Sequence, residues 1–369
     1  MAKKNAASKF INLILRTFLS TKNINNCDLG SPEKFLIVRQ HNQLGDLLAG
    51  VSLFRAIKET YPKSHITLIV SPFNYPGLIK NKFIDRMFIF DKKKIFKPGY
   101  FVEFYNLLRE DYDAAIVPVV VSISFTSNLI ARFSKAKIRI GPESLNGEIN
   151  ESRYLFDRRI KLDWRKHPDS NISERSLDIV RPFGINTKNY RSEISFDEDD
   201  IRIADEFINE IELKKEELLI GLHVGAGKPN NRWSLQKYIS LINNLNQKYS
   251  AKFYLTGSAS DKEELDYIKN NCTIDAALFL NREIPQVAAL ISKSDLFISN
   301  DTGIMHVAGS TDTSQISIFG PTNPFNWAPI GNNKYFIRKS ELIDDVSVQD
   351  VLDICHSILR KHNSLQSNR

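Results

Sequence analysis

Short apolar runs alternate with amphipathic stretches in the first part of the chain. The apolar runs predict buried strands because turn residues bound each of them. They cover residues 35–39, 65–70, 87–90, 114–121 and 138–140. Helical periodicity lies between them over residues 46–61, 100–110 and 125–134, and Pro62 ends the first of these helices. This alternation predicts a parallel sheet covered by helices on both faces.

The same alternation starts again in the second part. Strands are predicted over residues 218–223, 252–256, 277–280, 296–298 and 315–319, and helices over 234–249, 260–270, 284–292, 305–308 and 347–359. The sequence therefore predicts two doubly wound α/β domains, which would place a cleft at the carboxyl edges of their sheets.

A charged stretch separates the two parts. It runs over residues 153–215, with helices expected at 173–183 and within 195–215, and we interpret it as the connection between domains. The predicted organisation is a basic amphipathic tail (1–30), a first Rossmann-like domain (31–185), a connection (186–215), a second Rossmann-like domain (216–345), and a C-terminal helix and tail (346–369).

Composition narrows the class of protein. The 369 residues are 42% hydrophobic and 25% charged, as in an ordinary soluble globular protein. A net charge of +7 favours anionic partners such as nucleic acid, acidic lipid or a phosphorylated glycan, but no nucleic-acid-binding motif is present. The three cysteines lie far apart, which fits a reducing cytoplasm and gives no metal-ligand spacing.

The N-terminal tail has a helical apolar face. Phe10, Leu13, Ile14 and Phe18 fall near one side, with basic residues around them. This pattern is typical of a basic helix at a membrane interface. A frayed tail, or a helix packed on the body, is an equal alternative. The pattern does not indicate a secretory signal, because the apolar run is short and interrupted.

The segment 295–324 carries the most specific chemistry. An apolar run ends in a polar turn, a short helix follows, and a second strand ends in Gly320-Pro321-Thr322. At the carboxyl end of a parallel strand, such a turn directs backbone N–H groups and a helix N-terminus at one point. The segment therefore predicts a phosphate-binding loop.

The motifs taken together resemble glycosyltransferase family 9, the ADP-heptose:lipopolysaccharide heptosyltransferases. They are Gly-Asp-Leu-Leu at 45–48, the loop from Gly225 to Trp233, and Asn-Asp-Thr-Gly-x-x-His followed by Phe-Gly-Pro-Thr. The resemblance implies the GT-B fold, an acceptor domain followed by a nucleotide-sugar domain, and inverting transfer without a metal ion. It implies an ADP-sugar donor rather than a bound cofactor. It also implies a lipopolysaccharide core or other anionic glycolipid acceptor, with the enzyme at the cytoplasmic face of the inner membrane.

Asp46 falls on the family's catalytic aspartate. The attacking acceptor hydroxyl must lose its proton, and a carboxylate within hydrogen-bonding reach can accept it. Without the resemblance, a first-turn acid that interacts with the helix dipole would be the simpler interpretation.

The resemblance places donor-binding residues in the second domain. Asp301, Thr302, Gly303 and His306 would surround the diphosphate, although a helix cap and a buried structural histidine are the alternatives. In the loop with Gly225 and Ala226, the family's usual lysine is replaced by Asn231, so Lys228 and Arg232 are the expected cations. Trp233 is expected to pack in the core. The turn with Gly257, Ser258 and Asp261 would contact the ribose, or cap a helix, and Arg282 would border the adenine.

The acceptor side is less specific. The candidates are Gly45 and the basic residues Arg39, Arg55 and Lys58, for which solvated surface is the alternative. Two other enzyme classes stay open. A nucleotide-sugar 2-epimerase shares the fold, and a Rossmann dehydrogenase is disfavoured because no G-x-G-x-x-G follows the first strand. A degenerate, non-catalytic nucleotide-binding protein is the non-enzymatic alternative.

Overall fold

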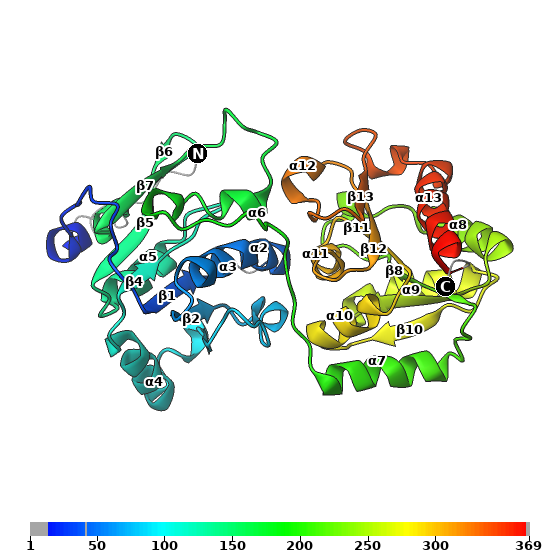
Figure 1. Ribbon diagram of the computed structural model, residues 1–369, viewed down its shortest axis with the longest axis horizontal. Coiled ribbons are helices and arrows are strands. Elements are labelled where there is room, and N and C mark those ends of the chain that lie inside the picture. The colour runs from blue at the N-terminus through cyan, green and yellow to red at the C-terminus, as the bar shows by residue number, and fades with distance from the viewer. Residues whose placement is uncertain (1–13, 41–42, 367–369) are drawn as a thin grey trace. The chain divides into compact units, whose positions relative to one another are not determined.

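Two sheets organise the chain, parallel throughout except where β6 runs antiparallel to β5 (Figure 1). The computed structural model describes residues 14–40 and 43–366, with side chains described as far as residue 360. It divides into two units. Unit 1 holds the residues up to Tyr75 together with Lys82–Tyr190, and unit 2 holds Pro76–Asn81 and the residues from Arg191 onward. Each unit is a doubly wound α/β structure, as the sequence predicts.

The sheet of unit 1 has the order β3-β2-β1-β4-β5-β6, and β7 also pairs with β5. Its strands are β1 (Lys34–Arg39), β2 (His65–Val70), β3 (Arg86–Ile89), β4 (Ala114–Ile116), β5 (Ile138–Leu145), β6 (Glu148–Ile149) and β7 (Arg158–Leu162). β1 lies between β2 and β4, with Phe35 opposite both Ile66 and Ala114. Its apolar run is continuous because helices cover both faces of the sheet.

Five labelled helices belong to unit 1: α2 (Leu44–Ala49), α3 (Val51–Thr60), α4 (Pro98–Arg109), α5 (Phe125–Phe133) and α6 (Ile172–Arg175). Short 3-10 turns lie at η1 (Tyr75–Gly77, which continues into unit 2), η2 (Lys92–Lys94), η3 (Arg153–Leu155) and η4 (Arg181–Phe183). α4 and α5 pack on one face of the sheet, where Phe104 and Ile130 join the core of Leu36 and Val38. α2, α3 and α6 contact one another (Figure 1).

The sheet of unit 2 has the order β10-β9-β8-β11-β12-β13, and its strand pairs are parallel. The strands are β8 (Leu218–His223), β9 (Ala251–Gly257), β10 (Ala277–Leu280), β11 (Leu296–Asn300), β12 (Ser314–Ile318) and β13 (Lys334–Ile337). An added Cβ at Gly221 would lie 2.3 Å from the ring of Tyr254, so glycine is required at the centre of β8.

The helices of unit 2 are α7 (Glu198–Glu210), α8 (Leu235–Lys248), α9 (Lys262–Asn271), α10 (Ile284–Ser292), α11 (Gly303–Gly309), α12 (Pro324–Trp327) and α13 (Val348–Gln366). Its 3-10 turns are η5 (Pro229–Asn231), η6 (Ala259–Asp261) and η7 (Ile343–Asp345). α8, α9 and α13 share one core with the sheet, while α7 and α11 pack against α10 (Figure 1).

Several predicted elements need correction. The helix expected over 46–61 is two helices, because the chain breaks at Gly50. The strand expected over 114–121 ends at Ile116, shortly before Pro118, which has no N–H for the ladder. The helix expected over 173–183 ends at Arg175.

The segment interpreted as a connection is largely built into the two units. Arg158–Leu162 forms β7 in the sheet of unit 1, so the charged side chains there conceal a strand. α7 packs on α10, and the ring of Phe207 lies 4.9 Å from that of Phe279.

The described part of the tail is attached to unit 1. Ile14 and Phe18 lie on a short helical segment with exposed side chains, whereas Phe10 and Leu13 lie outside the described residues. Thr21 donates its N–H to Tyr154 and Ile24 donates to Asp157. Among the described residues, no helix is both long enough and apolar enough to span a bilayer.

Candidate active site

Each sheet has a point where the strand order reverses, and ligands of open α/β sheets bind beyond the carboxyl ends of the strands there. In unit 2 this switch point lies between β8 and β11, which end at His223 and Asn300. In unit 1 it lies between β1 and β4, which end at Arg39 and Ile116. Nearly all the predicted site residues lie on loops or helices that follow β1, β8, β9 and β11.

Asn300 holds the loops of unit 2 together. Its fully buried amide donates to the carbonyl of Val224 at 2.8 Å. Its Oδ1 accepts from the N–H of Trp233 at 3.2 Å and from the hydroxyl of Tyr238 at 3.0 Å. Trp233 is buried and donates its indole N–H to Val346, which confirms its expected place in the core. Asn300 is therefore a structural residue rather than a free ligand group.

Asn231, which replaces the usual lysine, binds Asp301. Its amide donates to the Asp301 carboxylate at 2.9 Å and to the Asp301 carbonyl at 3.2 Å. Burial raises the pKa of Asp301, and hydrogen bonding from Thr322, the charge of Lys228 and the Asn231 amide oppose that shift. Three separate loops, which contribute Asn231, Asp301 and Thr322, thus meet at one carboxylate. Lys228 is exposed, and its charge acts on the same group.

Thr302 begins the helix after this turn. Its hydroxyl accepts from the N–H of Ile304, so the cap expected at Asn300-Asp301 is made by Thr302 instead. Gly303 is the first residue of α11. His306 is 6% exposed, and its ring lies edge-on to Trp327 at 6.2 Å. Burial lowers the pKa of His306 to about 4, so the ring is neutral at pH 7.

Asp261 lies against the end of β8. Its Oδ2 accepts from the N–H of Ser258 at 2.8 Å and from the Ser258 hydroxyl at 2.9 Å, which is the helix-capping alternative. An added Cβ at Gly225 would come within 2.2 Å of the other oxygen, Oδ1. Gly225 therefore leaves room for this carboxylate, whereas a Cβ at Gly257 would lie 2.7 Å from Cδ1 of Leu265.

His223 is a buried residue that we did not select from the sequence. Its Nδ1 lies 3.0 Å from the carbonyl of Thr256 and 3.1 Å from the Thr256 hydroxyl. Burial lowers its pKa, and the charge of Asp261 works against that shift. His223 could have been selected from the sequence because it is the last residue of a predicted strand, where ligand-binding residues of such sheets lie.

Arg232 and Arg282 are both partly engaged. The Arg232 guanidinium donates to the carbonyl of Ala226 at 2.8 Å and to Glu264 at 2.5 Å. Arg282 is exposed, and its guanidinium lies 5.2 Å from the centre of the Phe279 ring. Among the described residues, the Lys228 ammonium forms neither an ion pair nor a hydrogen bond, and the contact of Arg282 is the one with the Phe279 ring.

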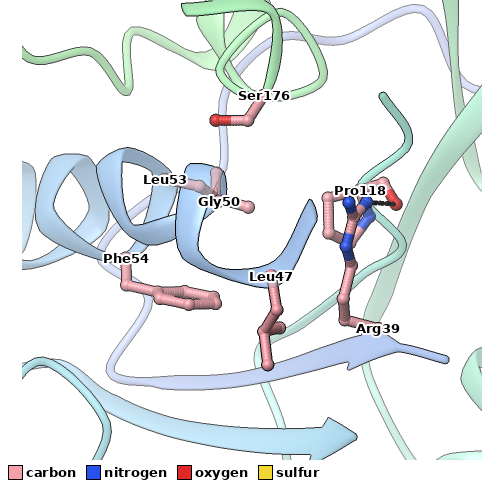
Figure 2. A pocket seen from close by; sticks show the side chains of 7 residues that line it. All are labelled: Arg39, Leu47, Gly50, Leu53, Phe54, Pro118 and Ser176. Atoms are coloured by element: carbon pink, nitrogen blue, oxygen red, sulfur yellow. Dashed lines mark hydrogen bonds between the residues drawn. The ribbon is translucent and has the colours of Figure 1, made fainter. Parts of the chain in front are cut away.

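In unit 1 a buried carboxylate accompanies a buried cation. Asp46 is the third residue of α2 and is 3% exposed, and Gly45 beside it is also buried. Arg39, at the end of β1, donates to the carbonyl of Asp46 at 3.1 Å. It also donates to the carbonyl of Pro118 at 3.1 Å, as Figure 2 shows. Burial lowers the pKa of Arg39 to about 10, and the charge of Asp46 opposes that shift. Arg39 thus spans the switch point and compensates the Asp46 charge.

A crevice next to Arg39 is too small for a sugar. Leu47, Leu53, Phe54 and Pro118 contribute to its lining (Figure 2), and its volume is about 10 Å³, the space of one water molecule at most. A wider groove of about 650 Å³ lies elsewhere in unit 1, on the loop after β7 and on α6, where Trp164 and Arg175 contribute to its wall.

Two acceptor candidates do not join Asp46. Lys58 is near the end of α3, where its ammonium binds Asp85 at 2.6 Å and the carbonyl of Ser64, just before β2 begins. That is the amino edge of the sheet, opposite to Asp46. Arg55 is buried, donates to the carbonyl of Asn189 at 2.7 Å and lies over the Phe83 ring. The structure therefore gives both side chains structural partners.

Among the described residues, no three His, Cys, Asp or Glu side chains are grouped so that they could hold a metal ion. The predicted catalytic and donor-binding residues lie at the two switch points, Asp46 after β1 and the donor loops after β8, β9 and β11.

The two Rossmann-like units have the GT-B fold, and solved structures agree. The glycosyl transferase family 9 protein from Veillonella parvula superposes with a TM-score of 0.77 at 17% identity, covering 92% of this chain and 100% of that one. The ADP-heptose lipopolysaccharide heptosyltransferase II of E. coli gives a TM-score of 0.72 at 21% identity, with 89% and 99% covered.

The sequence comparisons give the family. The model of glycosyltransferase family 9 (heptosyltransferase) matches residues 103–353, well over half of the chain. The chain therefore belongs to glycosyltransferase family 9. The lipopolysaccharide core heptosyltransferase OpsX of Haemophilus influenzae is 25% identical over 304 residues, which is 81% of this chain and 82% of that protein.

Proposed function

We propose that this glycosyltransferase moves a heptose, or a related sugar, from ADP-heptose to a lipopolysaccharide core or similar glycan. The relatives support the donor and acceptor classes, because they include an ADP-heptose lipopolysaccharide heptosyltransferase and a lipopolysaccharide core heptosyltransferase. A glycolipid acceptor of this kind places the reaction at the cytoplasmic face of the inner membrane.

The proposed reaction is one displacement with inversion. The acceptor hydroxyl oxygen bonds to the anomeric carbon while the bond from that carbon to the diphosphate oxygen breaks. The hydroxyl proton passes to the Asp46 carboxylate, and ADP leaves with the bonding electrons. Neither a metal ion nor a covalent enzyme intermediate takes part in this scheme. The leaving diphosphate is stabilised by backbone N–H groups at Thr302 and Gly303, by His306 and by Lys228.

The burial of Asp46 carries the assignment of the base. Another first-turn acid, Asp200 of α7, is 2% exposed, but it belongs to a capping box with Asp197 and pairs with Lys80. Asp46 is 3% exposed beside a buried guanidinium, in a helix whose N-cap side chain forms no capping hydrogen bond. Asp350 offers the comparison, because it is also the third residue of its helix, α13, yet it is half-buried and paired with Lys339.

The test is Asp46→Asn. Transfer, followed as ADP release in the presence of a lipopolysaccharide core acceptor, should fall by about 10²- to 10⁴-fold, the contribution typical of a general base. ADP affinity measured by calorimetry should not change, because Asp46 lies in the other unit. The matched control, Asp350→Asn, should retain full activity. Wild-type rates in Asp46→Asn would exclude this base.

The same assay separates the alternatives. Release of ADP that requires the acceptor supports the transferase. Conversion of the nucleotide sugar without any acceptor would indicate a 2-epimerase. If the protein bound ADP but neither released it from a donor nor altered the sugar, a degenerate nucleotide-binding protein would be the better description.

A further inference from the structure

A basic and aromatic surface covers the outer side of α4 and the turn before it. We call it the α4 patch. It consists of Lys92, Lys93, Lys94, Phe96, Lys97, Phe101, Val102 and Tyr105. Phe96 is 93% exposed, and the three apolar residues on the helix are each about half exposed. None of these residues belongs to the donor loops or to the surroundings of Asp46.

The helix presents this face in a fixed orientation. Its inner side buries Phe104, Leu107 and Leu108 in the core of unit 1, which turns Phe101 and Tyr105 outward. The rings of these two residues are neighbours, with centroids 6.4 Å apart. The segment that leads into α4 is also fixed in place. The Tyr100 hydroxyl accepts a hydrogen bond from the N–H of Asp91 and donates one to the carbonyl of Ile89. In Figure 1, α4 lies at an outer end of its unit.

The lysines of the patch keep their charges for an external partner. Within the described part of the chain, none of the four ammonium groups forms an ion pair. Asp91 is the nearest acid in sequence, and its carboxylate accepts from the backbone N–H of Lys93 as the cap of η2. The other charged lysines of unit 1 that lie near carboxylates, such as Lys135 and Lys137, are paired with Asp111 and Asp113.

We infer that the α4 patch binds the surface of a membrane that contains anionic lipid. Exposed aromatic rings among lysines without ion pairs are suited to such a surface. The rings can enter the membrane interface while the ammonium groups contact the headgroup phosphates. The four lysines lie exposed along the turn η2 and at the N-cap of α4, spread over the surface rather than grouped at one point. The inference depends on the proposed function only for the glycolipid nature of the acceptor, and binding to lipid can be measured without it.

The binding has two separable parts. Each lysine near an anionic surface is expected to contribute about five-fold to the partition constant, so the loss of three should weaken binding about 100-fold at low salt. Salt should reverse this part, because it screens exposed charges. Removal of Phe96 and Phe101 should weaken the binding that persists at high salt.

The experiment is sedimentation of the full-length protein with phosphatidylcholine vesicles that contain or lack 30% phosphatidylglycerol. Two variants are compared with the wild type: Lys92→Ala/Lys93→Ala/Lys94→Ala and Phe96→Ala/Phe101→Ala. The matched controls are Lys188→Ala/Lys214→Ala/Lys215→Ala, which removes equal charge from other exposed sites, and Phe133→Ala, which removes an exposed ring from α5. Binding should depend on phosphatidylglycerol and fall in the patch variants alone.

Other results would overturn the inference. Vesicle binding that survives in both patch variants would belong to another part of the chain, such as the tail. An equal loss of vesicle binding in the control variants would show that only the net charge of the protein matters. Selective binding of a 20-nucleotide RNA by the same residues would show that the partner of the patch is a nucleic acid. Unchanged far-ultraviolet circular dichroism and ADP affinity confirm that each variant is folded.

A second readout separates this inference from the proposed function. Transfer to a lipid-free core oligosaccharide should be the same in the wild type and the patch variants, whereas transfer to vesicle-embedded glycolipid should fall with binding. If no acceptor supports transfer while vesicle binding still depends on the patch, the proposed function fails and the membrane contact stands.

Discussion

The two switch points share one strand topology but use opposite electrostatic solutions. In unit 1 the Arg39 guanidinium and the Asp46 carboxylate are both buried and interact electrostatically, and Arg39 donates to the backbone carbonyls of Asp46 and Pro118. In unit 2 the fully buried polar groups at the switch point are neutral, since Asn231, Asn300 and the two histidines carry no full charge at pH 7, and the carboxylate of Asp301 is only partly buried. In the proposed reaction the base has to stay ionised, whereas the diphosphate brings its own charge and needs hydrogen-bond donors.

The largest effect expected in this comparison comes from Arg39→Met. The change leaves Asp46 buried without its counter-charge, so the free energy of unfolding should fall by about 3 kcal/mol. Chemical denaturation measures this loss. The second variant, Arg39→Met/Asp46→Asn, should recover part of the stability because the uncompensated carboxylate is gone. Strict additivity of the two single changes would show that the two groups are not coupled.

The neutral site is tested by Asn231→Ala. This change removes two hydrogen bonds to Asp301, one of them to a charged group, so ADP affinity should fall by about ten-fold or more. Calorimetry measures the affinity. Asn230→Ala is the matched control, because Asn230 is exposed and makes no hydrogen bond with its side chain among the described residues. An equal loss in both variants would refute a specific role for Asn231.

His306 gives a pH-dependent contrast. Its folded pKa of about 4 lies below the ordinary value of 6.5, so the unfolded chain binds a proton that the free folded protein does not. The stability of the free protein should therefore decrease as the pH falls from 6.5 to 4. A bound diphosphate would favour the charged ring, so ADP binding at pH 6 should take up a proton. Calorimetry in buffers of different ionisation enthalpy detects this uptake, which His306→Gln should abolish.

The effect furthest from the switch points concerns a partly buried cation at the other edge of unit 2. Burial lowers the pKa of Lys334 to about 7, and its ammonium donates to the carbonyls of Ala308 and Thr313. Between pH 7 and 10.5 the unfolded chain binds more protons, so the stability should rise with pH across that window. Denaturation at pH 7 and pH 9 should show a rise that Lys334→Met lacks. ADP affinity should be unaffected in this variant.

The sequence predicts the sheets better than it predicts the site. β2, β8, β10 and α10 begin and end where the hydrophobic pattern places them, because periodicity within a segment reflects burial within that segment. β7 was missed because its charged residues hide the pattern. The break at Gly50 was missed because helical periodicity continues across it.

The contacts of the site could not be read from local patterns. Asn300 bonds to residues 62 to 76 positions away, and Asn231 bonds to Asp301 70 positions away. The order of strands in the sheet places these distant residues next to one another, and that order cannot be read from a single sequence. The departure from the family at Asn231 could be seen in the sequence, but its role as a partner of Asp301 could not.

The amide of Asn300 has a consequence for the thermodynamics of binding. It links two backbone carbonyls of the loop after β8 to the N–H that precedes α8 and to Tyr238. The loop is thus ordered when the chain folds, and little conformational entropy remains to be lost when a nucleotide arrives. We therefore expect a nucleotide to bind unit 2 quickly and with little rearrangement of this loop.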